Sequence, residues 1–158
     1  MSRVNIQNLQ SKQLDKDVFY MKKALLEAQI AYNKDEIPVG AIIVINDQII
    51  ARSHNLTELL NDVTAHAEMQ SITAAANFLG GKYLINCTLY VTVEPCQMCA
   101  GALYWSQISR IVYGTTDENR GFVKMKTQLH PKTEVVSGVL SEDCSNLMKQ
   151  FFINKRKK

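Results

Sequence analysis

Apolar side chains recur at helical spacing in the first part of the chain. They are Val18, Met21, Ala24, Leu25, Ala28 and Ala31, with charged residues between them. Because this spacing gathers apolar side chains on one face of a helix, it predicts an α-helix over residues 15–34. Residues 1–14 are polar and show no such period, so we expect them to form a flexible segment outside the domain.

Short runs of β-branched and apolar residues indicate strands. Residues 40–45 and 48–52 are two such runs, and Asn46 and Asp47 between them favour a turn, which predicts a β-hairpin. Further strand-like runs cover residues 88–93, 108–113 and 135–139.

Three more helices are expected between and after these strands. Thr64 is a candidate cap for a helix that carries His66 and reaches about Phe78, and Gly80 and Gly81 would end it. The other two helices are predicted over residues 96–105 and 141–154.

The order of these elements predicts an α/β fold. A helix over residues 96–105 lies between two strands, so we expect those strands to run parallel, joined by a right-handed crossover, beside the antiparallel hairpin. The expected architecture is therefore a three-layer α/β/α domain with a mixed sheet. With 158 residues, 46% of them hydrophobic, the chain can bury one core, and we place a single domain at residues 15–158.

Cysteine usage and the lack of long apolar stretches narrow the class of protein. The N-terminus has no apolar signal segment, and no stretch approaches the roughly 20 apolar residues that span a bilayer. We therefore expect a cytoplasmic protein with no membrane partner. In that reducing compartment the single C-x-x-C pair favours metal binding over disulfides, and Cys87 and Cys144 are expected to be core thiols.

Positive charge gathers at the C-terminus. The formal net charge is +3, yet the last ten residues hold five positive charges, among them Arg156, and no acidic residue. The rest of the chain is slightly acidic, so any affinity for a polyanion should be concentrated in this tail. A solvated helix end is the alternative.

Four residues in two short motifs carry the candidate chemistry. His66 and Glu68 lie two residues apart, and Cys96 and Cys99, which follow Pro95, lie three apart. Residues three apart share one face of a helix, so both sulfurs can bind one metal ion. Residues two apart do not, so His66 and Glu68 can converge on a metal only if their helix points its first turn at it.

These residues favour a catalytic zinc site with one Zn²⁺ per chain. His66, Cys96 and Cys99 would leave the fourth tetrahedral position open to water, whereas structural zinc sites have four protein ligands. Glu68 would take a proton from that water and return it to a leaving amine. H-x-E with P-C-x-x-C is the signature of zinc nucleobase deaminases. A structural zinc site, and a chance C-x-x-C beside a core histidine, are the alternatives.

From Asp35 to its end, the chain resembles the bacterial tRNA adenosine deaminases, which convert adenosine to inosine at the anticodon wobble position. The matching segments are EIPVGA at 36–41, TAHAEM at 64–69, LYVTVEPC at 89–96 and MCAGA at 98–102. This resemblance implies a cytidine-deaminase-like fold with a mixed five-stranded sheet. It also implies a homodimer, with the tRNA anticodon stem-loop as its partner.

The resemblance assigns further residues to the substrate. Asn55 matches an asparagine that helps to hold the target nucleotide, and its amide can donate and accept hydrogen bonds. A turn residue that ends the second strand is the alternative for Asn55. Pro38 and Val39 match apolar residues beside the base pocket, and entry into the first strand is the alternative for them. Asp117 matches an aspartate that contacts the RNA sugar, and a solvated loop aspartate is the alternative.

The C-terminal end is also similar to that family, because two aromatic residues precede the basic tail. We expect one ring, that of Phe151, to pack on the core and the other, that of Phe152, to stack on a base. Arg156 would meet phosphate.

Two departures from the family concern the substrate. Residues 117–121 read DENRG where many members have Asp-x-Lys-x-Gly, so Glu118 adds negative charge near the expected RNA path. Residues 104–107 read YWSQ in place of Ile-His-Ser-Arg, and the Tyr-Trp pair is similar to bacterial guanine deaminases. The leading hypothesis is deamination of adenosine in an RNA loop. The alternatives are a deaminase of a free nucleobase or nucleoside, and a non-catalytic, zinc-stabilised RNA-binding module.

Overall fold

A five-stranded sheet forms the middle of the structure, a computed structural model that describes residues 3–158. The strands are β1 (Gly40–Ile45), β2 (Gln48–His54), β3 (Thr88–Val93), β4 (Arg110–Thr115) and β5 (Glu134–Ser137). They lie in the order β2-β1-β3-β4-β5. The first two pairings in that order are antiparallel and the last two are parallel, so the predicted mixed sheet is confirmed.

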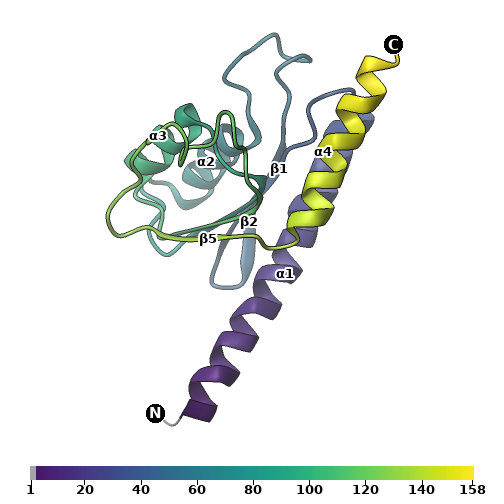
Figure 1. Cartoon of the computed structure of the whole chain (residues 1–158). Helices are drawn as coiled ribbons and strands as arrows, with labels where there is room; N and C mark the ends of the chain where they lie inside the picture. Colours follow the sequence, from purple (N-terminus) through teal and green to yellow (C-terminus); the bar gives the residue numbers. More distant parts are fainter. Residues whose placement is uncertain (1–2) are drawn as a thin grey trace.

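Two helices cover each face of the sheet (Figure 1). On one face lie α1 (Arg3–Asn33) and α4 (Ser141–Arg156), and on the other lie α2 (Ala67–Leu79) and α3 (Gln97–Ser106). The three-layer α/β/α architecture is thereby confirmed. Among the described residues, no helix is both long and apolar enough to cross a membrane.

The core consists of two apolar layers, one on each face of the sheet. Successive residues of the central strands alternate between them: Leu89 and Val91 face α2 and α3, whereas Tyr90 faces α1 and α4. The central strands are buried on both faces, which explains why their sequences read as continuous apolar runs rather than as alternating patterns.

The first helix is longer than the apolar pattern predicts. It begins at Arg3 instead of near residue 15, and its N-terminal part projects beyond the sheet as an exposed rod (Figure 1). Gln, Leu and Lys in this part are good helix formers, and a helix already formed on the sheet extends at little cost. The flexibility expected of residues 1–14 stays a prediction, and residues 1–2 lie outside the described part of the chain.

Strand ends differ from the predicted ends where turns intervene. β4 begins at Arg110 instead of Ile108, because α3 ends in a turn at Gln107 with a left-handed φ of 55°. β5 ends at Ser137, because Gly138 follows with a left-handed φ of 83°. The strand order and directions are unaffected by these shifts.

A buried ion pair ties α1 to two strands of the sheet. The Asp17 carboxylate accepts two hydrogen bonds from Arg110, each 2.7 Å long, and one of 2.8 Å from the hydroxyl of Tyr90. Only 2% of Asp17 is exposed. Burial is the largest single influence and opposes ionisation, but the hydrogen bonds from Arg110, Tyr90 and Gln13 together with the positive charge of Arg110 hold the pKa of Asp17 below its usual value.

We predict that Asp17→Asn lowers the free energy of unfolding at pH 7 by about 3 kcal/mol, because the largely buried Arg110 loses its buried partner and keeps only the exposed Glu134, 3.3 Å away. Because the pKa of Asp17 is lower in the folded than in the unfolded chain, the ionised carboxylate stabilises the fold at pH values above the ordinary aspartate pKa of 3.8. This contribution is lost as the pH falls through the folded-state pKa. The difference between variant and wild type, measured by chemical denaturation, should therefore shrink at acid pH.

Asp47→Asn is the matched control. Asp47 pairs with Lys16 at 3.1 Å but is 67% exposed, so this substitution should change the free energy of unfolding by less than about 0.5 kcal/mol. Equal losses in the two variants would contradict the role given to the Asp17 pair.

Candidate functional site

The histidine of the first motif lies at the start of α2. His66 is the N-cap residue of this helix, with extended backbone angles, and Glu68 follows in the first turn. The predicted cap is wrong: Thr64 instead donates through its N–H and its hydroxyl to Asp62, at 2.8 and 2.7 Å, and forms the turn before the helix. Since His66 only borders the helix, it and Glu68 can both face the space beyond the helix end, which is the end-on arrangement that a shared site requires.

The two cysteines lie in the corresponding place on α3. Cys96 is the N-cap residue and Cys99 lies in the first turn. Pro95 precedes Cys96, and Glu94 precedes Pro95. The N–H of Glu94 donates to the carbonyl of Thr115, at the end of β4, at 2.8 Å. Cys96 is half-buried and Cys99 is fully buried, so the site lies at the boundary between core and surface.

The two helix starts bring three donor atoms together. The Nδ1 atom of His66 lies 3.7 Å from Sγ of Cys96 and 3.6 Å from Sγ of Cys99. All three donor atoms lie within 4.8 Å of one another. Within residues 3–158 this is the one cluster of His, Cys, Asp and Glu side chains whose geometry can hold a metal ion.

Glu68 lies beside these ligands and is only 3% exposed. Burial raises the pKa of its carboxyl above the usual value. A hydrogen bond between the two sulfurs lowers the pKa of Cys96 to about 4 and raises the pKa of Cys99. Cys96 is therefore available as a thiolate, the form that binds metals, next to a carboxyl that can hold a proton.

Three predicted substrate-binding residues lie at the same edge of the sheet. Asn55 directly follows β2, and its N–H donates to the carbonyl of Val39 at 3.1 Å, beside the buried Pro38. The N–H of Leu56 donates to the carbonyl of Ala65 at 3.0 Å, one residue before the histidine of the metal group. The structure therefore brings Pro38, Val39 and Asn55 to the start of α2.

The Asn55 side chain also has a local structural contact. Its Nδ2 atom donates to the hydroxyl of Thr57 at 3.3 Å, and only 5% of the residue is exposed. This contact belongs to the turn after β2, which is the alternative role that the sequence leaves open for this residue.

Asp117 lies in the loop after β4, close to the metal-binding segment. Its N–H donates to the carboxylate of Glu94 at 3.2 Å, and Glu94 lies two residues before the metal ligand Cys96 in the chain. Its own carboxylate accepts the N–H groups of Asn119 and Arg120 at 3.0 and 2.9 Å. The side chain of Asp117 therefore closes a turn at the border of the site.

Phe152 and Arg156 lie on α4, against the face of the sheet opposite to α2 and α3 (Figure 1). Phe151 is 5% exposed and packs on the core, whereas Phe152 is 42% exposed. Lys155 donates to Asp35 at 2.7 Å, so the basic tail lies against the segment that leads to Pro38. The structure does not bring Phe152 and Arg156 to the metal ligands themselves.

Two buried carboxylates at this edge were not predicted. Glu36 is 1% exposed and accepts the N–H groups of Glu58 and Leu59 at 3.2 and 2.7 Å. Glu94 is 3% exposed and accepts N–H groups from the loop after β4. An acidic residue at the end of a buried apolar run is the signal that could have identified Glu94, because a buried charge needs hydrogen-bond partners.

Comparisons with known proteins agree with this geometry. A family model described as MafB19-like deaminase matches residues 15–156. The tRNA-specific adenosine deaminase of Bacillus subtilis (strain 168) is 44% identical over 151 residues, which covers 92% of this chain and 94% of that protein.

Two solved structures are similar to this fold. One comes from a study of A-to-I editing by tRNA deaminases at the wobble position of transfer RNA; it is 41% identical, has a TM-score of 0.77, and the match covers 82% of this chain and 98% of that chain. The other is a guanine deaminase from Bacillus subtilis, 39% identical with a TM-score of 0.60, and this match covers 62% of this chain and 63% of that chain.

These similarities confirm both the predicted family and the cytidine-deaminase-like fold. The match to the tRNA deaminases extends over nearly the whole of both chains, whereas the match to the guanine deaminase is partial. The chain is therefore a deaminase and belongs to the family of the tRNA-specific adenosine deaminases, within the MafB19-like deaminases.

Proposed function

We propose that the protein is a zinc-dependent hydrolytic deaminase that converts adenosine to inosine at the wobble position of the tRNA anticodon. The observation that carries this proposal is the convergence of His66, Cys96 and Cys99 beside the buried Glu68. The similarity to tRNA-specific adenosine deaminases over nearly the full length supports adenosine in tRNA as the substrate.

The donor set fits zinc. In a tetrahedral site with Zn–S bonds of about 2.3 Å and Zn–N bonds of about 2.0 Å, sulfur and nitrogen ligands lie about 3.6 Å apart. The distances of 3.7 and 3.6 Å from His66 to the two sulfurs agree with this geometry. We assign one zinc ion per chain to His66, Cys96 and Cys99, three ligands that leave one coordination position for the reaction.

Glu68 is assigned the proton transfers. A zinc ion in this site supplies Lewis-acid activation of water near neutral pH. The Glu68 carboxylate accepts a proton from the attacking water while the water oxygen bonds to C6 of adenine, the C6=N1 double bond opens, and Glu68 passes this proton to N1. Glu68 then moves the proton of the new C6 hydroxyl to the amino group, so that the C6–N bond breaks, ammonia leaves and C6=O forms. Because burial raises the pKa of Glu68, its carboxyl binds a proton more readily than an exposed glutamate does.

The edge of the sheet around the metal ligands supplies the contacts to the nucleotide. We assign hydrogen bonds with the nucleotide to Asn55, the apolar wall of the base pocket to Pro38 and Val39, and a contact with the RNA sugar to Asp117. A base in an anticodon loop is already partly unstacked, so moving it into such a pocket costs little.

The basic end of α4 supplies contacts farther from the reacting base. We assign stacking on a neighbouring base to the half-exposed Phe152 and a phosphate contact to Arg156. The tRNA anticodon stem-loop is thus the proposed partner, and a tRNA substrate implies that the enzyme acts in the cytoplasm.

We predict that the purified protein forms inosine in an anticodon stem-loop with a wobble adenosine. Its kcat/KM on this RNA should exceed that on free adenosine, guanine or cytosine by at least about 100-fold, because contacts remote from the base contribute to transition-state binding. Rapid turnover of free guanine together with an inert RNA would instead support the guanine deaminase alternative, which the Tyr104-Trp105 pair favours.

We predict that Glu68→Gln lowers kcat on the stem-loop by about 10³-fold, because the amide cannot transfer the proton. Metal analysis should still find one zinc per chain. Glu142→Gln, on the exposed side of α4, is the matched control and should keep kcat within about twofold of the wild type. Unchanged RNA deamination in the Glu68 variant would make the residue incidental, and a metal content far below one zinc per chain would remove the zinc assignment.

We further propose that the protein is a homodimer. Large apolar side chains are exposed around the C-terminal ends of α2 and α3: Phe78 at 56%, Trp105 at 77% and Ile85 at 48%. Apolar patches of this kind are typical of protein interfaces. In sedimentation velocity the wild type should therefore have a molar mass twice the 17.8 kDa of one chain. The Trp105→Glu variant should have a molar mass closer to that of the monomer. A wild type that sediments as a monomer at micromolar concentration would exclude the dimer.

A further inference from the structure

Glu94 is a buried carboxylate between β3 and the metal-binding segment. Both of its oxygens accept hydrogen bonds from one loop: Oε1 from the N–H of Asp117 at 3.2 Å and Oε2 from the N–H of Val123 at 3.0 Å. One side chain therefore holds both ends of the loop 117–123. Since Pro95 and Cys96 follow Glu94 directly, the loop is held against the segment that carries a metal ligand.

Backbone contacts fix the same loop to the same segment. Gly121 forms an isolated antiparallel bridge with Cys96. The N–H of Phe122 donates to the carbonyl of Pro95 at 2.9 Å. The ring of Phe122 is buried edge-on against Tyr113, with 6.0 Å between the ring centroids, so the loop is also anchored in the core.

The close approach of the Glu94 carboxylate explains the glycine at position 121. A β-carbon at Gly121 would collide with Oε2 and Cδ of Glu94 and would also press on the carbonyl of Asp117. Any side chain at this position would therefore displace either the carboxylate or the loop.

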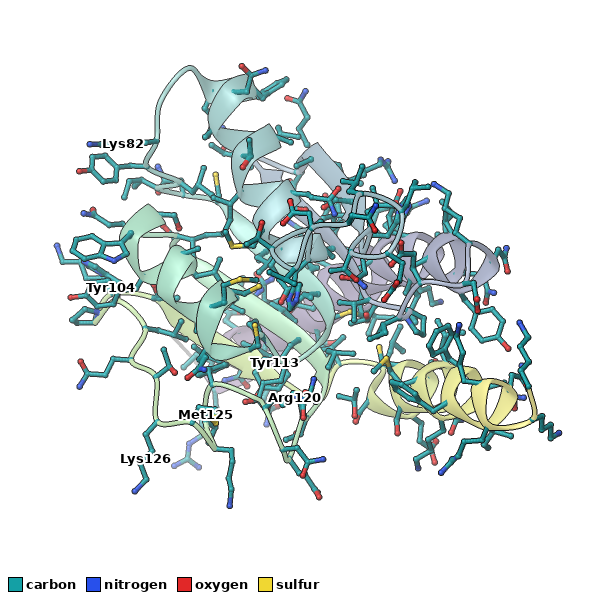
Figure 2. All side chains as sticks on the ribbon, turned by 90° about the horizontal axis from the view of Figure 1, so that it is seen from above. Lys82, Tyr104, Tyr113, Arg120, Met125 and Lys126 are labelled. Carbon is teal, nitrogen blue, oxygen red and sulfur yellow. The ribbon has the colours of Figure 1, made fainter. Side chains whose placement is uncertain are left out.

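The outer side of the loop and of the turn after it carries more basic than acidic groups. Arg120, Lys124 and Lys126 are exposed, against one exposed acid, Glu118, and the half-buried Asp117. Asn119 is exposed as well, and so are the apolar Val123 and Met125. Lys126 points outward from the molecule, as does Met125 beside it (Figure 2). The inner side of the loop thus contacts the metal-binding segment, and its outer side presents groups suited to sugar and phosphate.

We propose that Glu94 is a positioning residue for the RNA substrate. Its carboxylate fixes the loop 117–123 at a constant distance from Cys96, so that the outer side of the loop meets the RNA backbone while the base lies at the metal site. This inference rests on the proposed function of the site. It gives Glu94 an indirect role in substrate binding, through the loop 117–123, and no role in proton transfer or metal ligation.

Glu94→Gln tests the proposal directly. Glutamine offers one acceptor and one NH₂ donor, so one of the two loop N–H groups would face another donor. We expect faster hydrogen exchange at the amides of Asp117 and Val123, an unchanged zinc content and kcat within about threefold of the wild type. The KM for the stem-loop should rise about tenfold, because a loop without its anchor must be ordered when the RNA binds.

Gly121→Ala provides an independent second variant. The added methyl group displaces the carboxylate, so this variant should raise KM by a similar factor, and the double variant should not multiply the two effects. Gly81→Ala is the matched control, because a β-carbon at this position meets no atom within 4 Å. Asp17→Asn is the control for stability, since it weakens the fold away from the loop and should leave KM unchanged.

The outcomes separate this inference from the proposed function. A wild type that does not act on RNA would reject the proposed function and the role of Glu94 together. A wild type active on RNA with an unchanged KM in Glu94→Gln, or a variant that loses zinc, would overturn the positioning role alone. A rise in KM in the Asp17 variant as well would reduce Glu94 to a purely structural residue.

Discussion

The site depends on one geometric constraint: three donor atoms from two helix starts must lie within 4.8 Å of one another. The sheet topology meets this constraint. β1 runs antiparallel to both β2 and β3, and β4 runs parallel to β3, so the start of β1 and the ends of β2, β3 and β4 share one edge. The chain leaves this edge towards α2 after β2 and enters α3 after β3. His66, Cys96 and Cys99 are therefore brought together by strand directions and not by loop conformation alone.

The same topology brings irregular backbone to that edge, and this backbone needs hydrogen-bond partners. Buried N–H groups outside helices and strands must be paired with side chains or other carbonyls. Glu36 serves the segment before α2 and Glu94 serves the segment after β4, and each accepts two backbone N–H groups. The two acidic residues thus have matching structural roles on either side of the metal ligands.

Sequence patterns predicted those parts of the fold that rest on local apolar periodicity. The bounds of β1 and β3 agree with the prediction, because both strands are short runs of β-branched, aromatic and aliphatic residues, followed by turn-forming residues after β1 and by Glu94 and Pro95 after β3. The start of α1 at Arg3 was missed, because an exposed helical extension needs no apolar face. The cap of α2 was misassigned to Thr64, because a cap is chosen by backbone geometry and not by residue type alone.

The candidate site divides in the same way. The metal ligands and Glu68 could be identified from residue type and spacing, because few combinations of histidine, cysteine and glutamate satisfy zinc chemistry. Glu36 could not, because its partners are backbone N–H groups from a distant segment, which leave no pattern in residue type. For Glu94 the sequence offers only its place at the end of an apolar run, which indicates burial but not the loop that its carboxylate holds. The placement of Phe152 and Arg156 on the other face of the sheet likewise depends on how α4 packs, which no motif encodes.

The projecting part of α1 has a thermodynamic consequence. Residues 5–12 are exposed and belong to a helix whose later turns are fixed to the sheet through Asp17. We expect such an extension to unfold residue by residue from its N-terminal side, because the exposed residues 5–12 do not pack on the core and their unfolding is then not cooperative with it. The opening free energy of its backbone hydrogen bonds should therefore form a gradient, close to zero near Arg3 and rising to the global value around Asp17. The exposed first turns of this one continuous helix should therefore unfold in a local helix–coil equilibrium, whereas its later turns should unfold together with the rest of the domain.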